Sequence, residues 1–308
     1  MFKKMLLIIS LVLFVCIGIY EYYLQELKSK RFSDGLKLIQ DLDIQVYQGS
    51  GCLYALDKQK GTWKFVLDDV FASRPQSVVF GEGFLIAKDF KDYKTKLFYS
   101  NKSPDLLDEI DIYCPCALSN GQHQLAYFDF LNKNDKYESL NVIDIKSKAI
   151  ESYSDIRNAN SISWSLDDKS LYISRGEKIS RFNIENGEQS FIANGYWCKV
   201  LPNNEIGFWR IDGKYSTCLK MNIDTKNEDV MFSTKHYVLA ADWGPTGRYV
   251  IVLVSTAIHG FLFISDYVAL PIIWDTETGN QYWLPPLRDI KGGSVYWIDG
   301  KEVRFYNR

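Results

Sequence analysis

The chain has 308 residues, of which 46% are hydrophobic, and a formal net charge of −2. This composition supports one large folded domain or two average ones, and the lack of a basic excess argues against nucleic acid as a partner. Aromatic residues make up 15% of the chain, which suits sheets whose half-buried faces are covered by aromatic and β-branched side chains.

Residues 1–24 have the pattern of a membrane anchor or signal segment. Lys3 and Lys4 precede the uncharged run 5–20, MLLIISLVLFVCIGIY, and a basic start before an apolar run is typical of membrane targeting. No Ala-x-Ala site follows, and the run approaches the roughly 20 residues of a spanning helix. We expect a single-pass transmembrane or signal-anchor helix, with a cleaved signal as the alternative.

The basic residues around this segment predict its orientation. Lys3 and Lys4 favour a cytoplasmic N-terminus, while Lys28, Lys30 and Arg31 on the far side also count. Short basic N-termini before a single apolar run usually direct export of the downstream chain. We expect a protein of the inner (cytoplasmic) membrane facing the periplasm or exterior; a secreted or periplasmic protein after signal cleavage is the alternative.

Residues 25–42 mix leucine with charged residues and show no strand alternation. They predict a juxtamembrane helix or linker, broken near Ser33, Asp34 and Gly35. Because isolated helices this short are marginal in water, a disordered tether is the alternative.

From residue 43 to 308 the chain consists of strand patterns and turns. Six times an apolar strand runs into Asp or Asn and a polar turn, at steps of 39 to 53 residues. Repeats of about 40 to 50 residues with strand content predict a β-propeller. We expect the six residues to cap their own turns rather than to form a metal array: Asp57, Asn101, Asp144, Asn183, Asn222 and Asp275.

Between these copies lies a second strand–turn–strand pattern, with hairpin signals at 120–121 and 299–300. Two hairpins per repeat predict four-stranded blades. The domain opens with an outer hairpin at 52–66 and closes with an inner hairpin at 294–306. We therefore predict an all-β, six-bladed propeller whose shared blade joins the chain ends; residues 44–48 are an extra strand candidate in that blade, and seven blades are the alternative.

Two pairs of segments carry a family resemblance. ISWSLDDKSLYIS with ISRFNIENGEQSFI, and ADWGPTGRYVIVL with IIWDTETGNQYWL, resemble the Trp-Ser-Pro-Asp-Gly-Lys and Asp-x-x-x-Gly blade signature of the TolB-type WD40-like propellers. The resemblance covers residues 43–308, and only Trp164 and Trp243 open a blade in the family's manner. The globular domain that precedes the propeller in TolB has no counterpart here, so the resemblance implies the fold and not the function.

No motif predicts catalysis, a cofactor or a metal site. The histidines His123, His236 and His259 show no ligand spacing, and a Gly-x-Ser-x-Gly nucleophile motif is absent. Cys198 and Cys218 fall near one edge of the same blade, where they form either a disulfide or two buried free thiols.

The sixth blade contains the one unusual insertion. The step from 247 to 275 is 28 residues, against 15 for the corresponding step of the fourth blade, and the excess is apolar and aromatic. It lengthens the connection between the second and third strands, on the face that carries the connections between blades. Its residues either bind a partner or pack on neighbouring blades: His259, Phe261, Phe263 and Tyr267.

The sequence therefore predicts a non-catalytic, membrane-anchored propeller that binds a protein or envelope ligand, or serves as a scaffold, in the cell envelope. The alternative is a hydrolase or lactonase-like enzyme that uses the axial funnel, and a third interpretation is a purely structural subunit of an envelope complex.

Overall fold

The structure is a computed structural model. The residues that it describes are 15, 18, 19, 22, 26, 29–49, 51–70, 84–89, 94–99, 107–110, 113–121, 123–132, 135–153, 159–213, 215–244, 246–259, 265–287 and 294–299.

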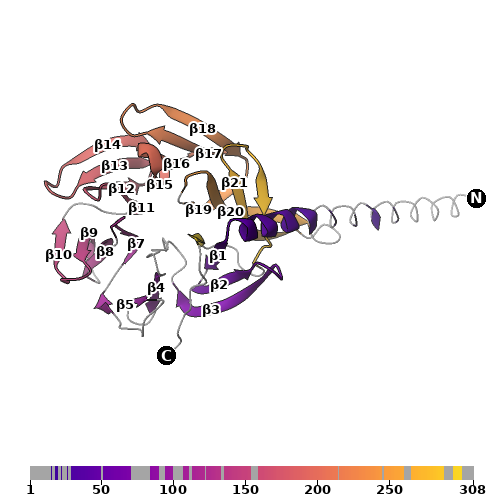
Figure 1. Cartoon of the computed structure of the whole chain (residues 1–308), viewed down its shortest axis with the longest axis horizontal. Helices are drawn as coiled ribbons and strands as arrows, with labels where there is room; N and C mark the ends of the chain where they lie inside the picture. Colours follow the sequence, from indigo (N-terminus) through magenta and orange to yellow (C-terminus); the bar gives the residue numbers. More distant parts are fainter. Residues whose placement is uncertain are drawn as a thin grey trace, which may run out of the picture.

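The described strands form six antiparallel sheets arranged around a common centre (Figure 1). Five of these sheets have four strands, and the sheet β4–β6 has three among the described residues. This arrangement is a β-propeller, as the repeat predicts. The first half of the chain contains β1 (Ile44–Gly49), β2 (Gly51–Asp57), β3 (Thr62–Val70), β4 (Phe84–Asp89), β5 (Lys94–Tyr99), β6 (Leu107–Ile110), β7 (Tyr113–Leu118), β8 (Gln124–Asn132), β9 (Asp135–Asp144) and β10 (Ile150–Tyr153).

The second half continues the same order of sheets. It contains β11 (Ala159–Trp164), β12 (Ser170–Arg175), β13 (Lys178–Asn183), β14 (Gln189–Asn194), β15 (Tyr196–Leu201), the 3-10 turn η1 (Pro202–Asn204), β16 (Glu205–Asp212), β17 (Tyr215–Asn222), β18 (Glu228–Thr234), β19 (Tyr237–Trp243), β20 (Tyr249–His259), β21 (Ser265–Asp275), β22 (Gln281–Trp283) and β23 (Ser294–Asp299). In five of the six sheets, one edge strand lies nearest the centre of the ring. These inner strands are β7, β11, β15, β19 and β23, and each contacts the next in this order.

The ring is closed by a blade that combines both ends of the propeller sequence. Strand β1 pairs with β2 on one side and with β23 on the other, from Ile44 opposite Asp299 to Gly49 opposite Ser294. This pairing covers an edge that would otherwise be exposed. The strand predicted at 44–48 is β1, which lies between β23 and β2. Of the inner hairpin predicted at 294–306, β23 covers the first half, and residues 300–306 lie outside the described residues.

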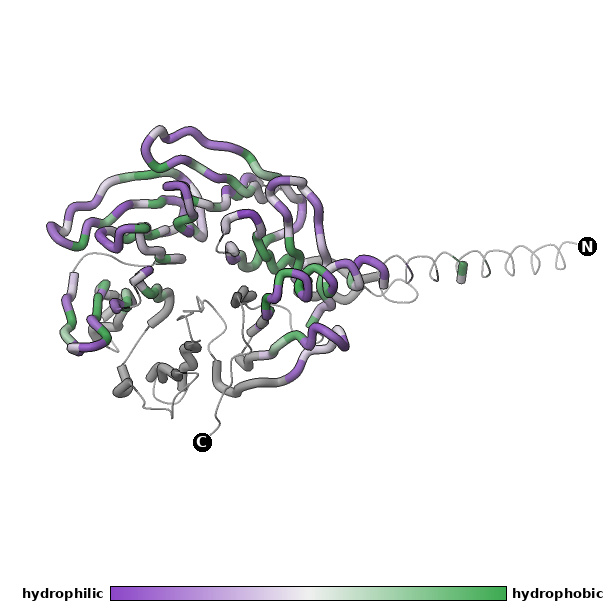
Figure 2. Tube along the Cα trace, viewed as in Figure 1, coloured by the Kyte–Doolittle hydropathy of each residue, from purple (hydrophilic) through white to green (hydrophobic). Residues whose placement is uncertain are grey.

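Large apolar side chains fill the space between neighbouring blades, because strand residues alternate between the two sides of a sheet. Trp209 and Trp243 are 0% and 1% exposed, and the rings of Phe232 and Trp274 stack with centroids 3.6 Å apart. Gly207 leaves room for Trp243, since a Cβ there would lie 2.5 Å from its indole ring. Figure 2 shows apolar residues along the strands of these blades, with hydrophilic residues at the turns.

Residues 29–41 form one helix on the outside of the ring, beside β1 and the sheet β19–β22 (Figure 1). Ile39 is fully buried against apolar residues of both blades, and the Arg31 guanidinium lies 4.6 Å from the centroid of the Trp283 ring. The break predicted near Ser33 is absent. Gly35 is part of the helix, and its missing side chain permits close packing against β22, because a Cβ there would overlap the Trp283 carbonyl.

The predicted membrane segment, residues 1–24, lies outside the described residues apart from Val15, Gly18, Ile19 and Tyr22. Among the residues that the structure describes, no helix has both the length and the apolar character needed to span a bilayer.

Candidate interaction face

The antiparallel order of each blade distributes its turns over two faces of the ring. The turn between the second and third strands lies on the same face as the connection to the next blade. We call this the connection face; among the described residues it comprises the β12–β13 and β16–β17 turns, the β20–β21 hairpin and the connections β14–β15 and β18–β19. Loops held by a rigid scaffold in this way commonly carry binding residues.

Tyrosines from three segments lie on the connection face. Tyr237 and Tyr215 are 64% and 46% exposed, and the Lys235 ammonium lies 5.8 Å from the centroid of the Tyr215 ring. The hydroxyl of Tyr196 donates a 2.8 Å hydrogen bond to Glu177. This hydrogen bond, with partial burial, raises the pKa of Tyr196, and Tyr237 lies close enough to contribute to the shift.

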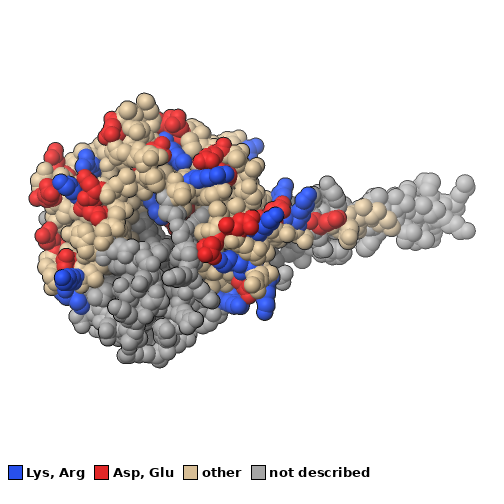
Figure 3. All heavy atoms as spheres, in the orientation of Figure 1, with Lys and Arg blue, Asp and Glu red and all other residues tan. Residues whose placement is uncertain are grey.

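These tyrosines have the character of a protein-contact surface, because a phenol ring combines apolar area with a polar tip. No motif in the sequence marks them. In the sequence these tyrosines are distinguished only by their position next to a predicted turn or blade connection, and many polar residues share that position. On the side of the ring seen in Figure 3, the basic and acidic side chains of the described residues are interspersed rather than gathered by sign.

The β20–β21 hairpin is longer than the sheet to which it belongs. The two strands pair from Tyr249 opposite Asp275 to His259 opposite Ser265, whereas β19 covers β20 only as far as Ser255. The last residues of β20 and the first of β21 therefore extend beyond the inner strand, as a two-stranded ribbon on the connection face.

The four residues predicted for binding belong to this ribbon or its tip. His259 is the last residue of β20, rather than a loop residue, and Tyr267 lies in β21 opposite Ala257. Phe261 and Phe263 lie outside the described residues. The extra length of the sixth blade thus includes longer strands, and a binding role for these residues stays a prediction.

Of the two alternatives for Cys198 and Cys218, the structure has two buried free thiols rather than a disulfide. They lie in β15 and β17, with β16 between these strands, and they pack in different apolar clusters. Strands spaced about 4.8 Å apart place the two backbones beyond disulfide reach. Burial raises the pKa of Cys198 to about 12 and that of Cys218 well above its usual value, which makes both poor nucleophiles.

The face opposite the connection face carries the repeated Asp and Asn residues. Each described member accepts hydrogen bonds from backbone N–H groups two or three residues ahead, so the prediction of turn caps is confirmed for these five: Asp57, Asp144, Asn183, Asn222 and Asp275. Asn101 lies outside the described residues. The Lys64 ammonium, 2.9 Å from Asp57, and the N–H of Lys60 hold the pKa of Asp57 at about 2.

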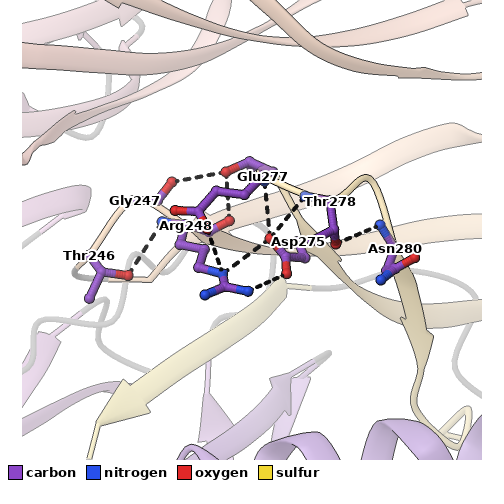
Figure 4. A network of polar contacts seen from close by, with 8 residues as sticks. Thr246, Gly247, Arg248, Asp275, Glu277, Thr278 and Asn280 are labelled. Atoms are coloured by element: carbon purple, nitrogen blue, oxygen red, sulfur yellow. Dashed lines mark hydrogen bonds and ion pairs between the residues drawn. The ribbon is translucent and has the colours of Figure 1, made fainter.

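Asp275 has a second function in its turn, which Figure 4 shows. Arg248 donates to its carboxylate through Nε at 3.2 Å and Nη2 at 2.8 Å, and also lies 3.3 Å from Glu277. The Asp275 side chain is 2% exposed. Burial alone would raise the pKa of Asp275. The hydrogen bonds from Arg248 and from the N–H of Glu277 together outweigh burial and lower this pKa. The network links the β19–β20 turn to the end of β21.

Near the centre of the ring, Lys199 of β15 joins β19. Its ammonium lies 2.9 Å from Oδ1 of Asp242 and 2.9 Å from the Trp243 carbonyl oxygen. Within the described ranges, no group of three or more His, Cys, Asp or Glu residues is arranged to hold a metal ion. His123 is exposed after the 120–121 turn and His236 lies on the β18–β19 connection.

Comparisons with known proteins show similarity at the level of structure. No protein-family model and no curated protein sequence matches the chain. TolB from Acinetobacter baumannii matches with a TM-score of 0.60 and 13% identity over 83% of this chain and 66% of that chain, which is just under two thirds. A putative TolB from Agrobacterium tumefaciens matches with a TM-score of 0.59 and 11% identity, over 84% of this chain and 99% of that chain.

A chain of a nidogen/laminin complex gives a TM-score of 0.58 and 11% identity, over 83% of this chain and 98% of that chain. At these identities the likeness is one of fold. The chain has a TolB-like β-propeller fold, which confirms the resemblance found in its blade motifs.

Proposed function

We propose that this chain is a non-catalytic protein-binding module of the cell envelope, and that its partner docks on the connection face. The observation that carries this proposal is the exposure of Tyr215 and Tyr237 on a closed ring. Tyrosine is enriched at interfaces and in their energetic centres. A closed ring also holds the backbone of these residues in place before binding, which lowers the entropic cost of association.

We further propose that residues 1–24 anchor the module in the inner membrane, with the ring on the periplasmic or exterior side. The support is the basic start and apolar run of this segment. The occurrence of the same fold in a nidogen/laminin complex agrees with a role in protein association. Of the sequence-predicted residues, His259 and Tyr267 would extend the contact along the β20–β21 ribbon.

Photocrosslinking in intact cells tests the docking face. A benzophenone amino acid replaces Tyr237 in one variant and Asn186, an exposed residue in the β13–β14 turn of the opposite face, in the control. We expect a discrete adduct with one protein from position 237 and none from position 186. The substitution Tyr215→Ala should reduce the adduct without changing the amount of folded protein. Equal adducts at both positions, or none at 237, would contradict the proposed face.

A further inference from the structure

An open pocket extends from the β12–β13 turn along one side of the sheet β11–β14. The described residues that line it are Arg175, Gly176, Lys178, Ser180 and Gln189. The turn has two residues between the strands, and Gly176 adopts the positive φ of 52° that such tight turns require. Because Lys178 and Ser180 are two apart in β13, they lie on the same side of the sheet, and the pocket therefore collects two cations, a hydroxyl and an amide.

The two cations face each other across the hairpin. Arg175 and Lys178 are direct partners in the register of β12 and β13, and like charges directly opposite in a sheet are destabilising. Among the residues that the structure describes, neither side chain has an ion pair or hydrogen bond. The hairpin thus carries an electrostatic cost that no neighbour in this part of the chain offsets.

The one carboxylate in the turn is engaged elsewhere. Glu177 accepts the hydrogen bond of Tyr196 at 2.8 Å, on the other side of the hairpin from its neighbour Lys178. The turn itself is fixed in place, because Asn160 donates to the Gly176 carbonyl at 3.1 Å and the N–H of Gly195 donates to the Glu177 carbonyl at 2.7 Å. The acidic group closest in sequence is therefore held away from the cations.

We propose that this pocket binds a carboxylate of an acidic segment in the partner protein, an inference that rests on the proposed protein-binding function. A guanidinium takes a carboxylate in a two-pronged arrangement, and an ammonium adds a point charge. Arg175 and Lys178 supply these groups, and Ser180 and Gln189 supply neutral donors. In a chain with a net charge of −2, a pair of cations fits a short acidic peptide better than a nucleic acid, whose affinity depends on many phosphate contacts.

The purified full chain is tested with a fluorescein-labelled hexaglutamate peptide, by fluorescence anisotropy at low salt. We expect Arg175→Ala and Lys178→Ala each to weaken binding about fivefold or more, as for loss of a charge-assisted hydrogen bond. Lys146→Ala, which removes an exposed lysine from the opposite face, should leave binding unchanged. A hexaserine peptide should not bind.

A second variant separates binding from folding. Lys178→Glu places opposite charges across the hairpin, so we expect a melting temperature at or above that of the native chain together with loss of hexaglutamate binding. Retention of binding in Lys178→Glu would overturn the proposal, as would binding of an oligothymidylate of equal charge as tightly as the peptide. An adduct at position 237 without hexaglutamate binding would leave the docking face standing and reject the pocket alone.

Discussion

The substitution Gly35→Ala tests whether the helix of residues 29–41 is an integral part of the ring. A Cβ at this position would overlap the backbone carbonyl of Trp283, and a backbone atom in a sheet cannot rotate away as a side-chain end would. The helix must therefore retreat from the sheet β19–β22. Ile39, which is fully buried one turn further along, loses part of its contact with the blades when this happens.

The magnitude follows from two losses of packing energy and one compensating gain. Overpacking of a close contact costs about 1–3 kcal/mol, and a gap of 0.5–1 Å forfeits roughly a quarter to a half of the dispersion energy at Ile39. Alanine offsets up to about 1 kcal/mol through its higher helix propensity. We expect the free energy of unfolding of Gly35→Ala to fall by about 1–2 kcal/mol.

Urea denaturation of the purified full chain measures this change, and trypsin cleavage after the exposed residues Arg31 and Lys37 reports on the helix itself. The matched control is Ser33→Ala, an exposed position of the same helix, which should be neutral or slightly stabilising. If Gly35→Ala matched this control in both stability and cleavage rate, the helix would not be packed against the Trp283 carbonyl, and its proposed place in the ring would be refuted.

Three further predictions concern the blades. Gly207→Ala forces a Cβ to within 2.5 Å of the Trp243 ring, so denaturation should show a loss of about 1–3 kcal/mol. Arg248→Ala leaves Asp275 buried without its cation and should lower the melting temperature, and Asp275→Asn added to it should restore part of the loss, because an uncharged cap remains. The pKa of Asp57 lies at about 2, below its usual value of 3.8, so its contribution to stability is complete above about pH 5 and is lost as the pH falls through about 2. The substitution Asp57→Asn should flatten the pH dependence of stability in that window.

The sequence predicts the parts of the fold that depend on local chemistry. A turn cap requires one Asp or Asn at a fixed distance from a strand end. The five described turn caps can therefore be predicted from the local sequence alone. The same holds for four-stranded blades, because two hairpins per repeat leave few other arrangements.

Other features depend on residues far apart in the sequence and are not visible in local patterns. Gly35 has the pattern of a helix break, yet it serves close packing against Trp283, nearly 250 positions later. The repeat pattern places Cys198 and Cys218 near one edge of the same blade, but strand β16 lies between their strands and keeps them apart. The pairing of Arg175 with Lys178 becomes meaningful only once Glu177 is known to bond Tyr196, because a turn with one acidic and two basic residues has no special character in a sequence.

Asp168 and the repeated Asp and Asn residues on the opposite face bind groups within the fold, whereas Arg175 and Lys178 on the connection face do not. On the opposite face, Asp168 accepts hydrogen bonds from the N–H groups of Asn120 and Gly121 at 2.7 and 2.8 Å, which ties one blade to the next, and the repeated Asp and Asn residues are occupied by their own turns. Polar groups already hydrogen-bonded within the fold have little to offer a ligand.

On the connection face, Arg175 and Lys178 have no such partner among the described residues. A carboxylate from a partner would attract both cations and reduce the repulsion between them.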